Sequence, residues 1–316
     1  MMTSGRPALA LVLVLLVSVL SLTAVGQQRF TSKTIGVRVD VLVTNGHELV
    51  RGLSARDFEL RDEGVVQAVS EVELEGMPLN LILGFDTSGS VAGERMHYLL
   101  EAGNALLEGL RPQDRVALLS FASRVRLLAP LTPSRQQIRG ALSLLKAEGA
   151  TSLRDATFAA LALREDDPGR TLVLMFSDGA DTSSWLRSPP VIEAAKRTDA
   201  VIYAVAIADR QVHWLMTTPT RTGLAMGAIT QQTTTTVEDA GKFLENVTEE
   251  TGGRVLFANA NSDLRSAFER TLAEFRDRYV LSYVPTGVST SGWHRLEVKL
   301  KGKAGKVTAR RGYFAE

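Results

Sequence analysis

The chain of 316 residues is 45% hydrophobic and 22% charged, a globular composition with enough apolar residues for one large core or two smaller ones. Its formal net charge of +1 and its lack of a long basic run exclude nucleic acid as an implied partner. Because the chain contains no cysteine, disulfides and thiolate metal sites are also excluded.

The N-terminal segment differs from the rest of the chain in being almost wholly apolar. Residues Ala8–Leu22 follow a weakly positive start at Arg6, and Ala24 and Gly26 offer small residues for a cleavage site. We therefore expect a secretory signal peptide over residues 1–26 and an exported protein in the periplasm, the extracellular space or the envelope. The alternative is an uncleaved anchor, since this segment approaches the roughly 20 residues that cross a bilayer. Membrane contact is expected only through it.

Residues 27–76 are predicted to form a β-rich segment. The stretch 35–44 alternates apolar and polar residues and is rich in β-branched side chains, which is typical of a half-buried strand. Asn45-Gly46 then provides a hairpin-type turn. Residues 58–74 contain two further short strand candidates, and no helical periodicity interrupts the segment.

From residue 77 to residue 276, apolar runs alternate with segments of helical periodicity. The runs are continuous, as in strands that are buried on both faces of a sheet. The predicted strands are 79–85, 115–121, 171–176, 200–207 and 254–257, and the predicted helices are about 93–110, 134–147, 153–164, 188–198, 238–251 and 262–278. This order predicts an α/β fold with a doubly wound, mostly parallel sheet. The threonine-rich stretch 210–237 lacks periodicity, and we expect a long surface loop there.

After residue 276 the strand pattern returns. Residues 279–285, 293–300 and 306–314 are predicted strands with turn residues between them. We expect the C-terminal segment, 277–316, to pack with 27–76 as a small second domain. The α/β unit would then be an insertion between its two halves.

Five oxygen-bearing side chains lie where a doubly wound sheet places its ligands, beyond the carboxyl ends of the strands. Three follow the first strand of the α/β unit in the sequence D-x-S-x-S, one precedes the helix at 153, and one follows the strand 171–176. They are Asp86, Ser88, Ser90, Thr151 and Asp178. Hard oxygen donors without His or Cys suit Mg²⁺, with Mn²⁺ or Ca²⁺ as alternatives.

The three motifs together resemble the metal-ion-dependent adhesion site of von Willebrand factor A domains. They are the D-x-S-x-S sequence, the threonine of Gly149-Ala150-Thr151-Ser152-Leu153, and Ser177-Asp178-Gly179. The resemblance covers about residues 77–276 and implies that the serines and the threonine contact the metal directly, while the aspartates act largely through water. It also implies that an Asp or Glu of a partner protein completes the coordination. The two flanking segments are similar to bacterial von Willebrand A-related proteins, which are abundant in acidobacteria.

The function implied is an exported, metal-dependent protein-binding module that catalyses nothing. One alternative is a structural scaffold of the cell envelope, in which metal is optional. Another is a Mg²⁺-dependent hydrolase with Asp86 as nucleophile. Against the hydrolase, Ser88 replaces the second aspartate of a D-x-D pair, and no G-x-S-x-G, G-x-G-x-x-G or Walker A motif is present.

Several residues near these motifs have two interpretations. Asp155 either hydrogen-bonds the adjacent loop or stabilises the helix N-terminus. Asp181 lies either near the metal or, as we expect, in the loop as an exposed acid. Trp185 and Leu186 lie either on a ligand-facing rim or, as the favoured interpretation, in partly buried packing. No His/Asp pair is evident, so neither a catalytic nor a metal-binding role is expected for the scattered histidines, His47, His97, His213 and His294.

Overall fold

The computed structural model describes residues 36–46, 48–74, 76–165, 167, 169–177, 181–207, 241–258 and 260–315. The expected signal segment, the predicted loop over 210–237 and Asp178 lie outside these residues. Residues 36–316 belong to one compact unit of the chain. Within the described ranges, no helix has the length and apolar character needed to cross a membrane.

The α/β part is built on a six-stranded sheet with the order β11-β10-β9-β6-β7-β8. All neighbouring strands are parallel except β8, which runs antiparallel to β7. The strands are β6 (Leu79–Asp86), β7 (Arg115–Phe121), β8 (Val125–Thr132), β9 (Arg170–Ser177), β10 (Val201–Ile207) and β11 (Val255–Ala258). The prediction of an α/β fold around a mostly parallel sheet is therefore confirmed.

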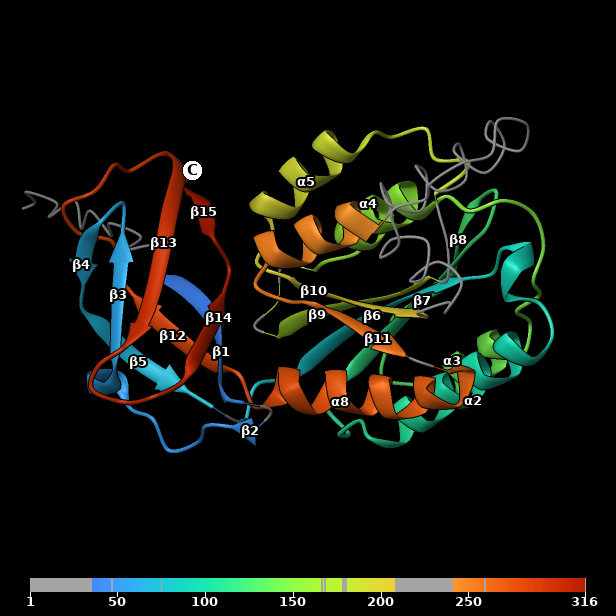
Figure 1. The fold of residues 1–316 in the computed structure, drawn as a ribbon, viewed down its shortest axis with the longest axis horizontal. Helices are drawn as coiled ribbons and strands as arrows, with labels where there is room; N and C mark the ends of the chain where they lie inside the picture. Colours follow the sequence, from blue (N-terminus) through green and yellow to red (C-terminus); the bar gives the residue numbers. More distant parts are fainter. Residues whose placement is uncertain are drawn as a thin grey trace, which may run out of the picture. The chain divides into compact units, whose positions relative to one another are not determined.

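Helices cover both faces of this sheet, with α2, α3 and α8 on one face and α4 and α5 on the other (Figure 1). Their bounds are α2 (Glu94–Glu108), α3 (Arg135–Leu142), α4 (Leu153–Ala162), α5 (Ser188–Arg197) and α8 (Leu264–Arg276), and residues 241–250 are also helical. Successive residues of β6 face opposite cores, since Leu83 and Phe85 belong to one and Ile82 to the other. This double burial explains why the strand is apolar throughout.

Two elements differ from the sequence prediction. Helix α3 ends at Leu142, not near 147, and its last turn is closed by Ser143, whose hydroxyl donates to the carbonyl of Gly140 at 2.8 Å. Strand β8 was not predicted, because it is an edge strand with partly exposed residues and an internal Pro130. Proline is tolerated at a sheet edge, where one side of the strand needs no ladder hydrogen bond.

The remaining strands form two further sheets that draw on both ends of the described chain. In the first, β1 (Val37–Asn45) lies between β12 (Tyr279–Tyr283) and β14 (Lys306–Ala309), with β5 (Val69–Glu73) beside β12 and β2 (Glu48–Leu49) beside β1. The second has the order β15-β13-β3-β4, with bounds β15 (Gly312–Ala315), β13 (Gly292–Leu300), β3 (Phe58–Asp62) and β4 (Val65–Gln67). We call these two sheets the β-module. The domain boundaries at 77 and 276 stay a prediction.

The β-module also departs from the sequence prediction in detail. Residues 58–74 hold three strands where two were expected, and the single predicted run 306–314 is divided between β14 and β15 in different sheets. One histidine pairs with an acid of which the sequence shows no sign. The Nδ1 atom of His294 lies 2.9 Å from a carboxylate oxygen of Asp62, and both side chains are buried. These partners are far apart in sequence, so no local pattern indicates them.

Arg278 connects the β-module to the α/β part. Its guanidinium is fully buried and donates to the hydroxyl of Tyr203 on β10 at 3.1 Å, to the carbonyl of Asp40 on β1 at 3.1 Å and to the carbonyl of Gly252 at 2.7 Å. The side chain of Asp40 forms an ion pair with Arg170, at the start of β9. The cost of burying this charge is offset in part because Nη1 and Nη2 donate to fixed acceptors, whereas Nε is buried without a hydrogen-bond partner among the described residues.

Three short 3-10 turns complete the described elements. They are η1 (Ala55–Asp57), η2 (Gly89–Val91) and η3 (Asn261–Asp263). The second of them begins at Gly89, shortly after β6 ends at Asp86, and therefore carries part of the D-x-S-x-S sequence.

Candidate metal centre

Asp86 ends the central strand β6 at the carboxyl edge of the sheet, and its side chain is fully buried. One carboxylate oxygen accepts a hydrogen bond from the backbone N–H of Ser88 at 2.9 Å. The other accepts from the hydroxyl of Ser177, the last residue of β9, at 2.8 Å. These contacts fix the orientation of the carboxylate. Ser177 was not singled out from the sequence, although its place beside Asp178 at a strand end was visible.

Ser88 and Ser90 lie next to each other in the turn after β6. Their hydroxyl oxygens are 2.9 Å apart, and Ser88 is buried while Ser90 is exposed. The two hydroxyls therefore form a short line from the interior to the surface. The strand, the acid and the two hydroxyls are thus brought together as the D-x-S-x-S sequence indicated.

The loop 148–151 is bonded to this turn at two points. The N–H of Gly89 donates to the carbonyl of Gly149 at 2.9 Å, and the N–H of Glu148 donates to the carbonyl of Thr87 at 2.8 Å. Gly149 has a φ of 80°, and an added Cβ would lie 2.6 Å from the hydroxyl oxygen of Ser123. Both the left-handed backbone and the close approach require glycine here. The loop that carries Thr151 is thereby held against the turn of the serines.

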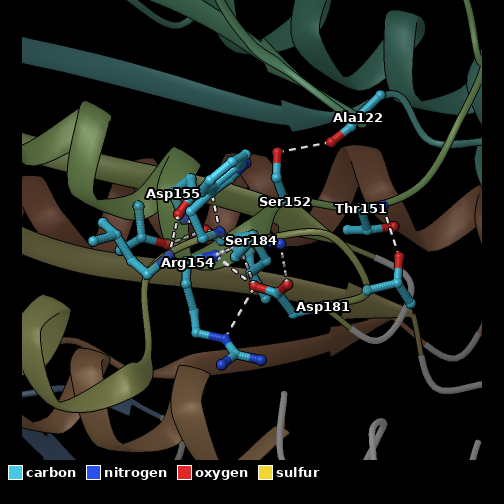
Figure 2. Close-up of polar contacts among 12 residues, drawn as sticks. Ala122, Thr151, Ser152, Arg154, Asp155, Asp181 and Ser184 are labelled. Atoms are coloured by element: carbon cyan, nitrogen blue, oxygen red, sulfur yellow. Dashed lines mark hydrogen bonds and ion pairs between the residues drawn. The ribbon is translucent and has the colours of Figure 1, made fainter.

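A second loop, 181–186, fixes the other side of Thr151 (Figure 2). The N–H of Thr151 donates to the hydroxyl of Thr182 at 3.0 Å, and its carbonyl accepts from the N–H groups of Thr182 and Ser183 at 2.8 and 2.9 Å. Thr151 itself is buried. The N–H and the carbonyl of Thr151 are therefore both bonded to the loop 181–186.

Asp181 is not an exposed loop acid as expected but is buried. It forms an ion pair with Arg154 at 3.1 Å and accepts hydrogen bonds from the N–H of Arg154 at 2.8 Å and of Ser184 at 3.0 Å (Figure 2). The carboxylate thus joins the loop 181–186 to the start of α4. The arginine neutralises its charge, which makes its burial tolerable.

Trp185 is 95% exposed, so the interpretation as partly buried packing is wrong for this residue, whereas Leu186 is partly buried against the core that contains Ile82, as that interpretation stated. The backbone of Trp185 is nevertheless fixed, because the carboxylate of Asp155 accepts hydrogen bonds from the N–H groups of Trp185 and Leu186. Asp155 therefore bonds the adjacent loop, as one of its two interpretations stated. A large apolar side chain is presented to solvent on a fixed backbone next to the Thr151 loop.

The donor chemistry of the cluster suits a hard divalent cation. Asp86, Ser88, Ser90 and Thr151 supply carboxylate and hydroxyl oxygens from bonded segments, while Asp178 lies outside the described residues. Among the residues that the structure describes, no group of three or more His, Cys, Asp or Glu side chains is placed to hold an ion. A cation here would consequently depend on the hydroxyls. That donor set favours Mg²⁺, Mn²⁺ or Ca²⁺ over softer metals.

Comparison with known proteins relates this segment to one family. Residues 81–180 match the family model of the von Willebrand factor type A domain. The inter-alpha-trypsin inhibitor heavy chain H4 of Bos taurus is 26% identical over 169 residues, which are 49% of this chain and 18% of the heavy chain. The uncharacterized protein sll0103 of Synechocystis is 29% identical over 124 residues, 37% of this chain and 28% of that protein. The matches span less than a third of either relative.

Two of the solved structures that align with this chain do so at TM-scores below 0.5. A von Willebrand factor type A protein from Catenulispora acidiphila superposes with a TM-score of 0.49 and 12% identity, covering 86% of this chain and 75% of that chain. The proximal thread matrix protein 1 of mussel byssus, solved with a zinc-occupied MIDAS motif, has a TM-score of 0.49 and 14% identity. That match covers 68% of this chain and 49% of the byssus protein.

Proposed function

We propose that this chain, which contains a von Willebrand factor type A domain, is an exported module that binds a partner protein through a divalent cation. The cation, Mg²⁺ in the first instance, would be held by Asp86, Ser88, Ser90, Thr151 and Asp178. A carboxylate of the partner would complete its coordination. The observation that carries the proposal is the hydrogen bond that joins the serine turn to the Thr151 loop. The N–H of Gly89 donates to the carbonyl of Gly149 at 2.9 Å.

The charge balance supports a carboxylate as the group recognised. Two aspartates offset the charge of a divalent cation, so an acidic group from outside is attracted without leaving a large unbalanced charge in the site. When bound, the cation supplies a positive point to which a carboxylate oxygen can bind directly. The protein orients the Asp86 ligand by hydrogen bonds from two sides, one from the hydroxyl of Ser177 and one from the N–H of Ser88.

The same contacts argue against a hydrolase. A nucleophilic carboxylate needs a free oxygen directed at a substrate. Both oxygens of Asp86 already accept hydrogen bonds, and the side chain is fully buried. A binding role needs no such attack, and it uses the fixed geometry as it stands.

The exposed Trp185 supports a protein as the partner. Tryptophan is enriched among the few residues that contribute most of the energy of protein interfaces. Its side chain is exposed, while its N–H is anchored by Asp155 at 3.0 Å. A fixed aromatic side chain next to the Thr151 loop offers an apolar contact beside the polar one.

The proposal is tested first by thermal unfolding in the presence of Mg²⁺ or Mn²⁺. A ligand at one hundred times its Kd stabilises the folded state by about 2.7 kcal/mol, which raises the Tm of a domain of this size by roughly 5–10 °C. We expect this rise in the wild type and in the surface control Glu101→Gln. We expect it to be lost in Ser90→Ala, whose side chain is exposed. Without the ion, this variant should lose about 1 kcal/mol, because the hydroxyl contact with Ser88 is gone.

Asp86→Asn and Asp178→Ala should abolish the rise as well. An equal rise in all three site variants would contradict the proposed ligands. If the wild type shows no ion-dependent rise, the scaffold role without metal becomes the better explanation. Capture of a partner from envelope extract, in Mg²⁺ but not in EDTA and with wild type but not Asp178→Ala, then tests the partner itself.

A further inference from the structure

A basic cleft opens directly beside the candidate metal centre. It has a volume of about 370 Å³, and its lining includes Arg124, Arg126 and Lys146. All three side chains are exposed, and none of them makes an ion pair with another described residue. Among the described residues that line the cleft, Glu148 is the single acidic one. Positive charge is therefore concentrated here, although the whole chain carries a net charge of only +1.

The cleft and the metal centre share structural elements. Thr87, between Asp86 and Ser88, lines the cleft, and so does Gly149, two residues before Thr151. Ser123, another lining residue, accepts a hydrogen bond from the N–H of Ala150 at 2.9 Å. A ligand that reaches the metal through an extended segment would therefore have its neighbouring residues within reach of the cleft.

We propose that this cleft binds acidic side chains that flank the metal-binding carboxylate in the partner's sequence. The inference rests on the proposed function and specifies the partner further, as an acidic peptide segment. Unpaired cations in a partly enclosed cleft attract carboxylates more strongly than cations on an open surface do. Each ion pair formed there contributes modestly, so the cleft selects among partners and does not replace the metal.

The lining favours a peptide over other polyanions. Leu144 is 73% exposed, and the partly buried Leu128 and Leu145 lie in the same lining. Such an apolar surface matches a segment that alternates acidic and apolar side chains. These leucines add nothing to the binding of a phosphate or sugar backbone, and the nearly neutral chain as a whole attracts a nucleic acid or an acidic polysaccharide only weakly over long range.

The test uses the full chain and two synthetic peptides, measured by fluorescence anisotropy with Mg²⁺ and with EDTA. Both peptides carry one central Asp and a Leu. One has Glu residues on either side, and the other has Gln, which is nearly the same size without the charge. We expect the Glu peptide to bind the wild type roughly three- to tenfold more tightly at low ionic strength, with the gain falling as salt screens the charges.

Arg124→Gln/Arg126→Gln should remove the gain and leave the affinity of the Gln peptide unchanged. Lys146→Gln should reduce it. The matched control Arg295→Gln, an exposed arginine of the β-module, should keep it in full. Melting curves check that each variant is folded. A gain in Glu-peptide affinity that persists in the double arginine variant overturns the inference. Inorganic phosphate that displaces the Glu peptide at a concentration near the peptide's own Kd overturns it as well, because the cleft would then be a site for free anions.

The two proposals fail in different ways. If the Gln peptide binds only with Mg²⁺ but the Glu peptide gains nothing, the metal function stands and the cleft inference is wrong. If the Glu peptide binds equally with Mg²⁺ and EDTA, and only when the arginines are present, the metal function is wrong. The cleft then binds acidic side chains by itself, and their place beside a metal-binding carboxylate falls with the metal function. Binding of neither peptide to the wild type overturns both.

Discussion

The carboxylate of Asp155 accepts a hydrogen bond from the backbone N–H of Trp185 at 3.0 Å, and it accepts a second from the N–H of Leu186 at 2.9 Å. An acid in the first turn of α4 thus holds the loop that presents the exposed tryptophan. Because α4 begins two residues after Thr151, the same short stretch of chain sets the position of a proposed metal ligand and of an apolar side chain beside it. This arrangement leads to the first two predictions.

Trp185→Ala is expected to leave stability within about 0.5 kcal/mol of the wild type, because the side chain is exposed and makes no packing contact that would be lost. Binding of a captured partner should weaken by about 2 kcal/mol, as for a residue central to an interface. Denaturation in urea and retention of the partner in Mg²⁺ measure the two effects. Phe257→Ala, another exposed aromatic, serves as the control and should retain full binding. Unaltered partner binding in Trp185→Ala would remove this residue from the interface.

Asp155→Ala is expected to destabilise the protein by about 1–2 kcal/mol, since two backbone N–H groups lose their acceptor. The loss should be local, so amide hydrogen exchange ought to accelerate at Trp185 and Leu186 more than in the strands of the sheet. Uniform acceleration over the whole domain would show instead that Asp155 supports the entire fold and not this loop.

Gly149→Ala is expected to cost roughly 1–3 kcal/mol, because the backbone has a φ of 80° and the new Cβ would lie 2.6 Å from Ser123. The ion-dependent rise in Tm should shrink with it, since the loop carries Thr151. Gly140→Ala is the matched control: it lies within α3 with no atom close to an added Cβ, so it should stabilise by about 0.5–1 kcal/mol. Equal stability of the two variants would contradict the strain argument.

Arg278→Met is expected to destabilise the protein by about 3–5 kcal/mol. The substitution keeps much of the apolar stem but leaves the hydroxyl of Tyr203 and the carbonyls of Asp40 and Gly252 without their buried donor. Lysine should not restore stability, because a single ammonium group cannot reach acceptors placed around a planar guanidinium. Arg295→Met, at an exposed position, should stay within about 0.5 kcal/mol. Chemical denaturation of the three variants decides the outcome.

The β-module should lose stability at alkaline pH. Burial, together with the hydrogen bond that its hydroxyl donates to Asp62 at 2.9 Å, raises the pKa of Tyr313 to about 12 from its usual 10.0. Burial also raises the pKa of Tyr283. The fold therefore favours the neutral phenols. The contribution of Tyr313 is fully present below pH 10 and is lost as the pH rises through about 12.

Denaturation midpoints measured between pH 8 and pH 12 test this directly. Tyr313→Phe should be less stable at neutral pH by about 1 kcal/mol, because the hydrogen bond to Asp62 is gone. It should also lose less stability on the way to high pH, since one of the shifted groups no longer titrates. A variant with the same alkaline slope as the wild type would assign the effect to other residues.

The sequence by itself determined the strands buried on both faces and the residues that follow them. Leu79–Phe85 had to be a central strand, because its continuous apolar run suits burial on both sides, and a turn with Asp86, Ser88 and Ser90 had to follow it. The D-x-S-x-S sequence is local, so the hydrogen bond between Asp86 and Ser88 and the contact between the two serines needed no distant partner.

Contacts between distant segments were decided only by the tertiary structure. The pairing of Asp62 with His294, the burial of Asp181 against Arg154 and the bridge made by Arg278 all join residues whose local patterns carry no sign of each other. The antiparallel edge strand β8 depends in the same way on what lies beside it. Periodicity records which side of an element is buried, whereas the identity of the buried partner is fixed by packing between elements, which sequence spacing does not encode.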